Sequence, residues 1–146
     1  MLRKKFEKDL YDAYDKPAKQ KLVELLKEQG HKILSTKEDY YFDVVSEKNG
    51  NTYYSEAEVK VSWKGDWPET WSDIRIPERK RRLLDKLNEK GLLNFYVFRK
   101  DLNQCFRIKD LSMKEDRIKK AFGRNIVSGE KFFHIPYTEA ELIQCR

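Results

Sequence analysis

The amino-acid sequence predicts an α/β protein in which helices pack against the faces of a mixed β-sheet. Residues 15–29 carry apolar side chains at helical spacing, and residues 52–61 alternate between apolar and polar side chains, as a strand with one buried face does. Asn49-Gly50 stands just before that strand and is the dipeptide best able to place two residues at positive φ in a tight hairpin. Helices and strands in mixed order along one chain are typical of this fold class.

The chain is long enough for one domain with its own core. It has 146 residues, of which 39% are hydrophobic and 13% aromatic, so it can bury enough apolar surface to fold unaided. Cys105 and Cys145 are too few and too scattered for a disulfide scaffold or a four-ligand zinc site. We therefore expect a single domain over residues 1–146.

Apolar spacing predicts two helices in the first 30 residues. Residues 2–14 place an apolar side chain at every fourth position, which indicates a short helix. Asp15 as an N-cap and Pro17 in the first turn predict that a second helix begins there, and Gly30 marks its end. The apolar stripe of this second helix comprises Ala18, Leu22, Leu25 and Leu26.

Two predicted hairpins supply most of the strands. In the first, residues 40–45 form a short apolar strand before the Asn-Gly turn, and residues 52–61 form the clearest strand pattern in the chain. One face of that second strand carries apolar side chains and the other carries charged ones. The two sets are Ala57, Val59 and Val61, and Glu56, Glu58 and Lys60. The further strand patterns are residues 31–34, 92–99, 104–108 and 131–135, of which 92–99 and 104–108 form the second hairpin.

The remaining segments predict a loop, two helices and a turn. We expect a loop over residues 63–76, which holds all three tryptophans, and a helix over residues 77–91 between Pro and Gly. Residues 112–115 match a capping box for a short basic helix that runs toward Phe122. Residues 138–141 match a cap for a terminal turn.

Two carboxylates and a lysine share one face of the strand over residues 52–61, and this combination needs a physical reason. Glu56 and Glu58 repel each other there unless a cation lies among them. Mg²⁺ binds oxygen ligands, usually one or two carboxylates together with water and a substrate phosphate. Lys60 beside such a metal can position or deprotonate an attacking water and stabilise the charge that develops on a phosphate.

Asp43 adds a further acid from the neighbouring strand of the first hairpin. Its carboxylate stands between Phe42 and Val44, where burial is costly without a partner. Adjacent antiparallel strands bring residues 43 and 58 within reach of one metal ion. The alternative interpretation is an exposed strand whose charges pair across strands, because a bare Glu-x-Lys is common in chains rich in lysine and glutamate.

These residues resemble the PD-(D/E)XK nuclease superfamily, whose sparse motif is an acid, a variable gap and then acid-x-lysine. Here the motif is Asp43 followed by Glu58-Val59-Lys60. The resemblance covers roughly residues 15–110. It implies a mixed β-sheet with the αβββαβ restriction-endonuclease-like core and flanking helices, similar to the small resolvase-like and RecB-like nucleases.

The resemblance also implies the roles of the site residues. Asp43 and Glu58 would bind the metal, the backbone carbonyl of Val59 would be a further ligand, and Lys60 would be the catalytic lysine. The implied cofactor is Mg²⁺, for which Mn²⁺ would substitute. Many relatives cut as dimers, so the resemblance also allows a homodimer.

Three points of the resemblance stay open. Phe42 stands where the name of the superfamily has proline. Many members add an acid from the first helix, but Glu24 and Glu28 lie opposite the apolar stripe of the predicted helix. Glu56 is either a further ligand or a residue that flanks the site.

The charge balance favours a polyanionic partner. The chain has 31 Lys+Arg and 25 Asp+Glu, a formal net charge of +6, and basic side chains release counterions from a phosphate backbone. Four cations near a helix N-terminus oppose the helix dipole, which predicts phosphate contacts, although a solvated basic face is the alternative. These cations are Arg79, Lys80, Arg81 and Arg82. In the tryptophan loop we expect Lys64 and Trp67 to contact nucleic acid, with Trp67 stacking on a base, and Trp63 to be structural.

The sequence therefore predicts a Mg²⁺-dependent endonuclease that hydrolyses phosphodiester bonds in DNA, with structured or branched DNA among its candidate substrates. The alternatives are a non-catalytic DNA-binding module of the same fold and an α/β protein whose charges only solubilise it. No run approaches the ~20 apolar residues of a membrane span. The basic N-terminus has no apolar stretch behind it, so we expect no signal peptide, no membrane contact and a cytoplasmic location in a prokaryotic or phage-infected cell.

Overall fold

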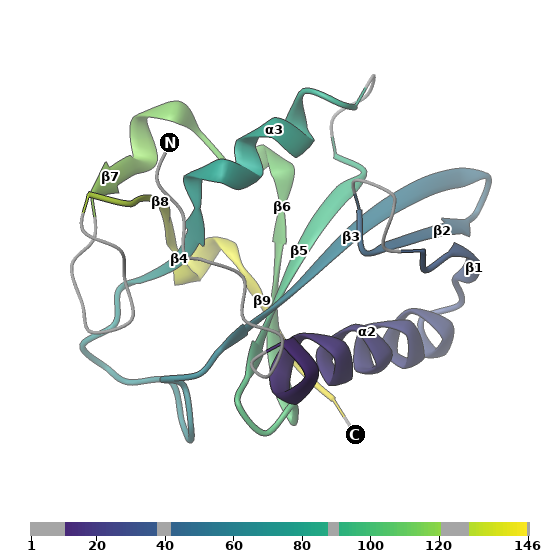
Figure 1. Cartoon of the computed structure of the whole chain (residues 1–146), viewed down its shortest axis with the longest axis horizontal. Coiled ribbons are helices and arrows are strands. Elements are labelled where there is room, and N and C mark those ends of the chain that lie inside the picture. Colours follow the sequence, from purple (N-terminus) through teal and green to yellow (C-terminus); the bar gives the residue numbers. More distant parts are fainter. Residues whose placement is uncertain (1–10, 38–41, 88–90, 121–128, 146) are drawn as a thin grey trace.

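A six-stranded mixed β-sheet runs through the middle of the structure, with further layers on both faces (Figure 1). This is a computed structural model, and it describes residues 11–37, 42–87, 91–120 and 129–145. The strand order is β1-β2-β3-β5-β6-β9, in which β3 and β5 run parallel and the other neighbours run antiparallel. The predicted α/β fold with a mixed sheet is confirmed.

The strands of this central sheet are β1 (Lys32–Ser35), β2 (Val44–Lys48), β3 (Asn51–Lys60), β5 (Leu93–Arg99), β6 (Gln104–Lys109) and β9 (Glu141–Gln144). A second, antiparallel sheet has the order β4-β8-β7 and comprises β4 (Asp73–Pro77), β8 (Lys131–Pro136) and β7 (Ile118–Lys120). The α-helices are α2 (Lys16–Glu28) and α3 (Arg81–Leu84). The short helical turns are η1 (Tyr11–Asp15), η2 (Glu78–Lys80), η3 (Asp110–Ser112), η4 (Glu115–Arg117) and η5 (Tyr137–Glu139).

Helix α2 covers one face of the central sheet (Figure 1). Its predicted apolar stripe is confirmed, because all four members are buried against side chains of β2, β5 and β6. The predicted N-cap is wrong: Asp15 has helical φ and ψ and makes no side-chain cap hydrogen bond. The reason is that the chain is already helical in η1, so α2 continues an existing helix. Most of the helix predicted over residues 2–14 lies outside the described residues.

The second sheet and α3 cover the opposite face of the central sheet (Figure 1). Strand β4 contributes Ile74 and Ile76, and β8 contributes Phe133 and Ile135, all with no exposed surface. These side chains pack against apolar residues of β5 and β6. Burial of large aliphatic and aromatic groups on both faces of the central sheet holds the layers together.

The turn of the first hairpin forms as predicted, but its first strand, β2, begins at Val44 and leaves Phe42 and Asp43 of the predicted strand outside it. Asn49 and Gly50 both have positive φ, at 53° and 82°, and this geometry matches the right-handed twist of the strands that it joins. Strand β3 keeps the predicted division of its two faces: Ala57 and Val59 pack against the cluster that contains α2. Val61 lies past the end of β3 and is exposed, contrary to the buried position that the alternation predicted.

Three predictions about the segments after β3 are wrong. The loop over residues 63–76 contains the first residues of β4, because pairing with the distant β8 gives Ile74 and Ile76 an apolar layer to enter. In place of a helix over residues 77–91, only η2 and the short α3 are helical among the described residues. The Ser112 hydroxyl donates to Glu139 and caps no helix, and the chain then enters η4 and β7. Residues 121–128 lie outside the described part.

The end of the chain also differs from the prediction, and it places the two cysteines together. The predicted terminal turn is η5, and strand β9 follows it along β6. As a result Cys105 on β6 and Cys145 just past β9 have their Sγ atoms 3.5 Å apart, and both side chains are buried. The two cysteines are far apart in the sequence, and only the pairing of β6 with β9 brings them together.

We expect Cys105 and Cys145 to form an intramolecular disulfide when the folded protein is treated with oxidised glutathione. An S–S bond of about 2.05 Å requires a further approach of about 1.5 Å, which the edge strand β9 can supply. Intact-mass spectrometry should show the loss of two hydrogen atoms, and Cys145→Ser should show none. A wild-type protein that stays fully reduced, or forms only mixed disulfides, would contradict the pairing of β6 with β9.

Candidate functional site

The candidate site lies where β2 separates from β3. Backbone pairing between these strands ends at Val44 and Ser55. Beyond that point side chains continue the connection: the Asp43 N–H donates to Glu56 Oε2 at 2.7 Å, and the Ala57 N–H donates to Asp43 Oδ2 at 2.9 Å. These two hydrogen bonds hold Asp43 beside β3, as the sequence predicted for a pair of neighbouring strands.

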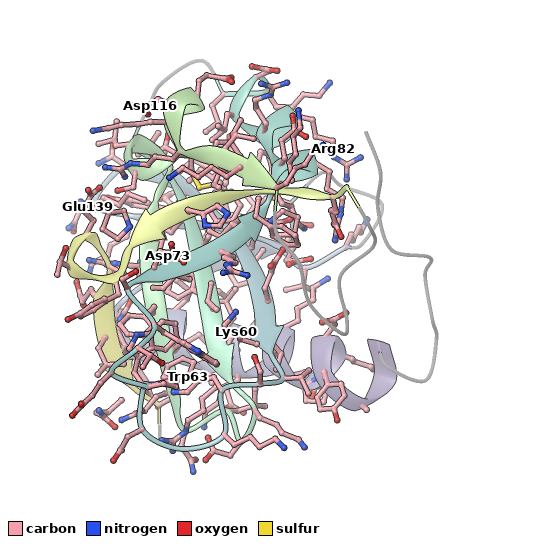
Figure 2. All side chains as sticks on the ribbon, turned by 90° about the vertical axis from the view of Figure 1, so that its left-hand side faces the viewer. Lys60, Trp63, Asp73, Arg82, Asp116 and Glu139 are labelled. Carbon is pink, nitrogen blue, oxygen red and sulfur yellow. The ribbon has the colours of Figure 1, made fainter. Side chains whose placement is uncertain are left out.

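The charged face of β3 points away from α2, toward the layer that contains β4 and η2. In the parallel register Glu56 lies opposite Phe95 and Glu58 lies opposite Val97, and both β5 residues belong to the apolar cluster under the second sheet. Lys60 is at the end of the same face, and Figure 2 shows it near β4 and the labelled Asp73. The predicted sharing of one face by these three charged residues is confirmed.

Lys80 of η2 supplies a cation to this face. Its Nζ lies 2.9 Å from Glu56 Oε1 and 3.7 Å from Glu58 Oε1. The side chain of Glu56 is only 4% exposed and that of Lys80 17%, so this ion pair is largely removed from solvent. Burial lowers the pKa of Lys80, but the carboxylates of Glu58 and Glu56 outweigh it, and the net shift is upward. The Lys80 ammonium therefore stays charged and partly neutralises the acidic face.

Asp15 is an acid of the candidate site that sequence reasoning missed. Its pKa is raised, first by partial burial and then by the negative charges of Glu58 and Asp43. The sequence did contain a signal. Asp15 precedes Ala18 by three positions and so lies in line with the apolar stripe of α2, although it is exposed, as Glu24 and Glu28 are.

The surroundings of Lys60 lower the pKa of its amine from the ordinary value. Burial lowers the pKa of its amine, and Arg75 lowers it further, against the opposing effects of Asp73 and Glu58. Its Nζ lies 5.2 Å from the centroid of the Trp71 ring, within the range of a cation–π contact. An amine that loses its proton more readily than usual is better able to act as a general base.

The backbone carbonyl of Val59 points toward the side of β3 that β2 leaves. In a strand the N–H and C=O of one residue point to the same side, and successive residues alternate. The Tyr54 N–H donates to Leu92 on the β5 side, and the Ala57 N–H donates to Asp43 on the β2 side. Val59 therefore directs its carbonyl to the side where Asp43 lies, as a further metal ligand would require.

The predicted nucleic-acid-binding cations occupy different settings. Arg79 pairs with Glu130 at 3.1 Å, and Arg81 pairs with Glu115 at 2.7 Å, while Lys64 and Arg82 are exposed. Together with the ion pair of Lys80, these pairs mean that three of the four clustered cations bind acidic side chains of the chain itself. The argument from the helix dipole does not apply, because α3 has only four residues. Contact of these cations with nucleic acid stays a prediction.

The tryptophan loop folds against the core. Trp63 is 1% exposed and stacks on Phe106 with ring centroids 5.2 Å apart, so its structural role is confirmed. Trp67 is half-buried and lies edge-on to Trp63, Trp71 and Phe106. Its indole N–H donates to the Trp71 carbonyl at 2.8 Å. The predicted contact of Trp67 with a base is not tested by this arrangement.

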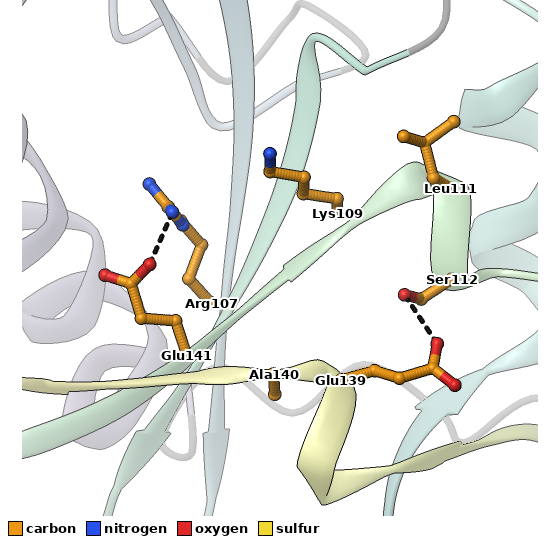
Figure 3. Close-up of a pocket in the computed structure, with 7 residues that line it drawn as sticks. All are labelled: Arg107, Lys109, Leu111, Ser112, Glu139, Ala140 and Glu141. Atoms are coloured by element: carbon orange, nitrogen blue, oxygen red, sulfur yellow. Dashed lines mark hydrogen bonds and ion pairs between the residues drawn. The ribbon is translucent and has the colours of Figure 1, made fainter.

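A shallow depression of about 480 Å³ lies apart from the acidic face, between β6, η3 and the β9 end of the sheet (Figure 3). Its lining residues are Arg107, Lys109, Leu111, Ser112, Glu139, Ala140 and Glu141. Within it Arg107 pairs with Glu141 at 2.6 Å, and Ser112 donates to Glu139 at 3.0 Å. Two of its charges thus pair with each other, in contrast to the excess of acids on the face of β3.

The donor chemistry of the acidic face fits Mg²⁺, which prefers carboxylate and carbonyl oxygens. Asp15, Asp43 and Glu58 supply carboxylates, and Val59 supplies a carbonyl. Across the part of the chain that the structure describes, however, no three or more His, Cys, Asp or Glu side chains are grouped as around a metal ion. The Lys80 ammonium lies beside one of these acids, with Nζ 3.7 Å from Glu58 Oε1.

Comparison with known proteins assigns no family, since no protein-family model matches the chain and no curated protein is significantly similar to it. Among the described residues, no helix is both long enough and apolar enough to cross a membrane. Any assignment of function therefore depends on the charged face of β3 and the residues around it.

We expect Trp67→Ala to lower the melting temperature by roughly 5–10 °C, because a large ring with three aromatic neighbours is lost from the edge of the core. Thermal unfolding followed by circular dichroism measures this effect, and Trp67→Phe should lose less. An unchanged melting temperature would contradict this packing role, and weaker nucleic-acid binding per folded molecule would show that the ring also contacts a base.

Glu56 should make stability depend on pH near neutrality. Burial raises its pKa from the ordinary 4.5 to about 7, although Lys80 acts in the opposite direction. Between these values the folded chain holds a proton that the unfolded chain has released, so the free energy of unfolding falls as pH rises through this interval. Urea unfolding at several pH values across the interval should show this slope in the wild type and a flatter one in Glu56→Gln. Equal slopes would contradict the burial of an ionisable Glu56.

Proposed function

We propose that this chain is a divalent-metal-dependent endodeoxyribonuclease whose site contains Asp43, Glu58 and Lys60, with Asp15 as the acid from the first helix. The observation that supports this best is the position of Asp43, which two hydrogen bonds hold against the strand that carries Glu58 and Lys60. Acids from two strands and a helix, beside a lysine with a lowered pKa, are the groups that such hydrolysis needs.

The order of elements gives further support. Helix α2, strands β1 to β3, helix α3 and strand β5 follow one another in the order αβββαβ, with β4 inserted before α3. Strands β3 and β5 lie side by side and parallel. This order is the one that the restriction-endonuclease-like core implies, so the fold and the motif favour the same superfamily.

Each residue of the site has a proposed role. The carboxylates of Asp43, Glu58 and Asp15 and the carbonyl of Val59 would hold Mg²⁺, or Mn²⁺ in its place. When bound, the metal would polarise the phosphodiester and lower the pKa of a water molecule. Lys60 would orient a water molecule through its amine, would accept a proton from it when neutral, and would stabilise negative charge on the phosphate when protonated.

The proposed substrate is DNA, including structured or branched DNA. The formal net charge of +6 favours approach to a polyanion. Lys64, Arg82 and the partly exposed Arg79 and Arg81 are the proposed phosphate contacts, and Trp67 is the proposed base contact. A homodimer would let two such sites act on both strands of a duplex, as in many members of the superfamily that the motif resembles.

A second candidate is a DNA-binding module of the same fold without catalysis. The observation that favours it is Lys80, whose ammonium already pairs with Glu56 and Glu58 and so neutralises part of the acidic face without a metal. The two candidates differ in one respect that is easily measured, since only the nuclease converts supercoiled plasmid to a nicked form when Mg²⁺ is added.

We expect Asp43→Asn and Glu58→Gln each to abolish Mg²⁺-dependent nicking, because each keeps the side-chain volume but removes the charge that attracts the metal. Lys60→Ala should slow cleavage by at least ~100-fold while metal affinity is largely kept. Cleavage would be measured on supercoiled plasmid and on linear, nicked, flap and four-way-junction DNA.

The matched control is Glu47→Gln, which changes an exposed acid of β2 and should cut at the wild-type rate. Equal cleavage by Glu58→Gln and the wild type would show that the metal site is wrongly assigned. A wild-type protein that binds DNA in a salt-dependent manner, but never cuts it with Mg²⁺ or Mn²⁺, would establish the binding module instead.

A further inference from the structure

Glu56 is the most deeply buried acid of the charged face, and both of its oxygens have partners within the chain. Oε2 accepts the Asp43 N–H at 2.7 Å, and Oε1 accepts a hydrogen bond from Lys80 Nζ at 2.9 Å. Its side chain is 4% exposed, against 23% for Glu58. Glu58 is therefore the more accessible of the two acids, and Glu56 is already committed to Asp43 and Lys80.

The contacts of Glu56 link Lys80 to Asp43 in a continuous chain. Lys80 holds one oxygen of Glu56, the other oxygen holds the backbone of Asp43, and the Asp43 carboxylate accepts the Ala57 N–H. Removal of Lys80 would leave a buried carboxylate without its counter-ion, which is strongly unfavourable. Removal of the Glu56 side chain would release the Asp43 backbone at the point where the strand ladder has ended.

We propose that Glu56 and Lys80 form a positioning pair for the metal site: Glu56 fixes Asp43 through its backbone N–H and is not itself a metal ligand, and Lys80 keeps Glu56 in place. This inference rests on the proposed function, since it concerns the same site. It also assigns Lys80 to the interior of that site and removes it from the set of phosphate contacts. Hydrogen-bonded partners of metal ligands commonly set the orientation of those ligands, and so the metal affinity.

The pair also connects the two layers of the molecule at the site. Lys80 belongs to η2, which directly follows β4 of the second sheet, whereas Glu56 belongs to the central sheet. The buried contact between them fixes the end of β4 against β3. The position of Asp43 therefore depends on the correct packing of the second sheet. Among the described residues, however, none in that sheet forms a hydrogen bond with Asp43.

The experiment measures Mn²⁺ affinity by isothermal titration calorimetry, and thermal stability without metal, on the full chain and its variants. E56Q keeps a carbonyl oxygen that can accept the Asp43 N–H, so its Mn²⁺ affinity should stay within about threefold of the wild type. E56A loses that acceptor and should weaken affinity by about 10- to 100-fold, as loss of a ligand's partner does. E58Q is the comparator, and its Mn²⁺ binding should fall below detection.

Lys80 is tested by rescue. K80M leaves Glu56 buried without a counter-ion, so it should lower both the melting temperature and the Mn²⁺ affinity. The double variant K80M/E56Q no longer buries an unpaired charge, and both quantities should return close to those of E56Q. General loss of folding would not be reversed by removal of the Glu56 charge, so recovery of metal affinity in the double variant is specific to this pair. The double variant can still be measured if K80M alone fails to fold.

The outcomes separate this inference from the proposed function. If the wild type binds Mn²⁺ but E56Q loses affinity as severely as E58Q, Glu56 is a ligand and the positioning pair is wrong. Equal, wild-type affinity in E56A would also overturn it, as would K80M with unchanged stability and affinity. A wild type that binds neither Mn²⁺ nor Mg²⁺ overturns the proposed function, and the positioning role falls with it.

Discussion

The structure depends on how strand β3 accommodates charged side chains in a sheet that is covered on both faces. Strand β3 pairs with β2 over Asn51–Ser55 and with β5 over Tyr54–Lys60, and its two faces meet two different layers. An acid such as Glu56 is costly in that position unless hydrogen bonds and a counter-ion accompany it. The Asp43 N–H and the Lys80 ammonium meet this requirement. The end of the pairing between β2 and β3 and the packing of η2 against β3 thus both serve to accommodate the buried Glu56.

Residues from four separate segments converge because of this arrangement. Asp15 enters from the end of η1, Asp43 from the residue just before β2, and Lys80 from η2 after β4. Each is placed by a different interaction: the buried stripe of α2, side-chain hydrogen bonds to β3, and an ion pair. The result is a group of acids with fewer cations than carboxylates, an excess that a divalent ion would offset. This imbalance is what distinguishes the face of β3 from the self-paired charges around Arg107 and Glu141.

Sequence reasoning succeeded where the signal was local and failed where a distant segment decided the outcome. The Asn49-Gly50 turn, the stripe of α2 and the alternation of β3 were predicted because each depends on neighbours a few positions away. Strand β4 was missed because its partner, β8, lies more than 50 positions later. The sequence predicts a phosphate contact for Lys80 because its acidic partners lie on another strand. It predicts a cap at Asp15 because an acid before a proline at a helix start is common in that role.

The insertion of β4 between β3 and β5 has a consequence for the order of assembly during synthesis. The meander of β1, β2 and β3 joins segments that emerge one after another, and it can form as soon as residue 60 is free. Strand β4 has to wait for β8, at residues 131–136, before it gains its hydrogen-bonded neighbour. Lys80 is anchored at the end of β4, so the acids of β3 receive their counter-ion late. A ribosome-bound chain that stops short of β8 would carry the acidic strand without the layer that neutralises it.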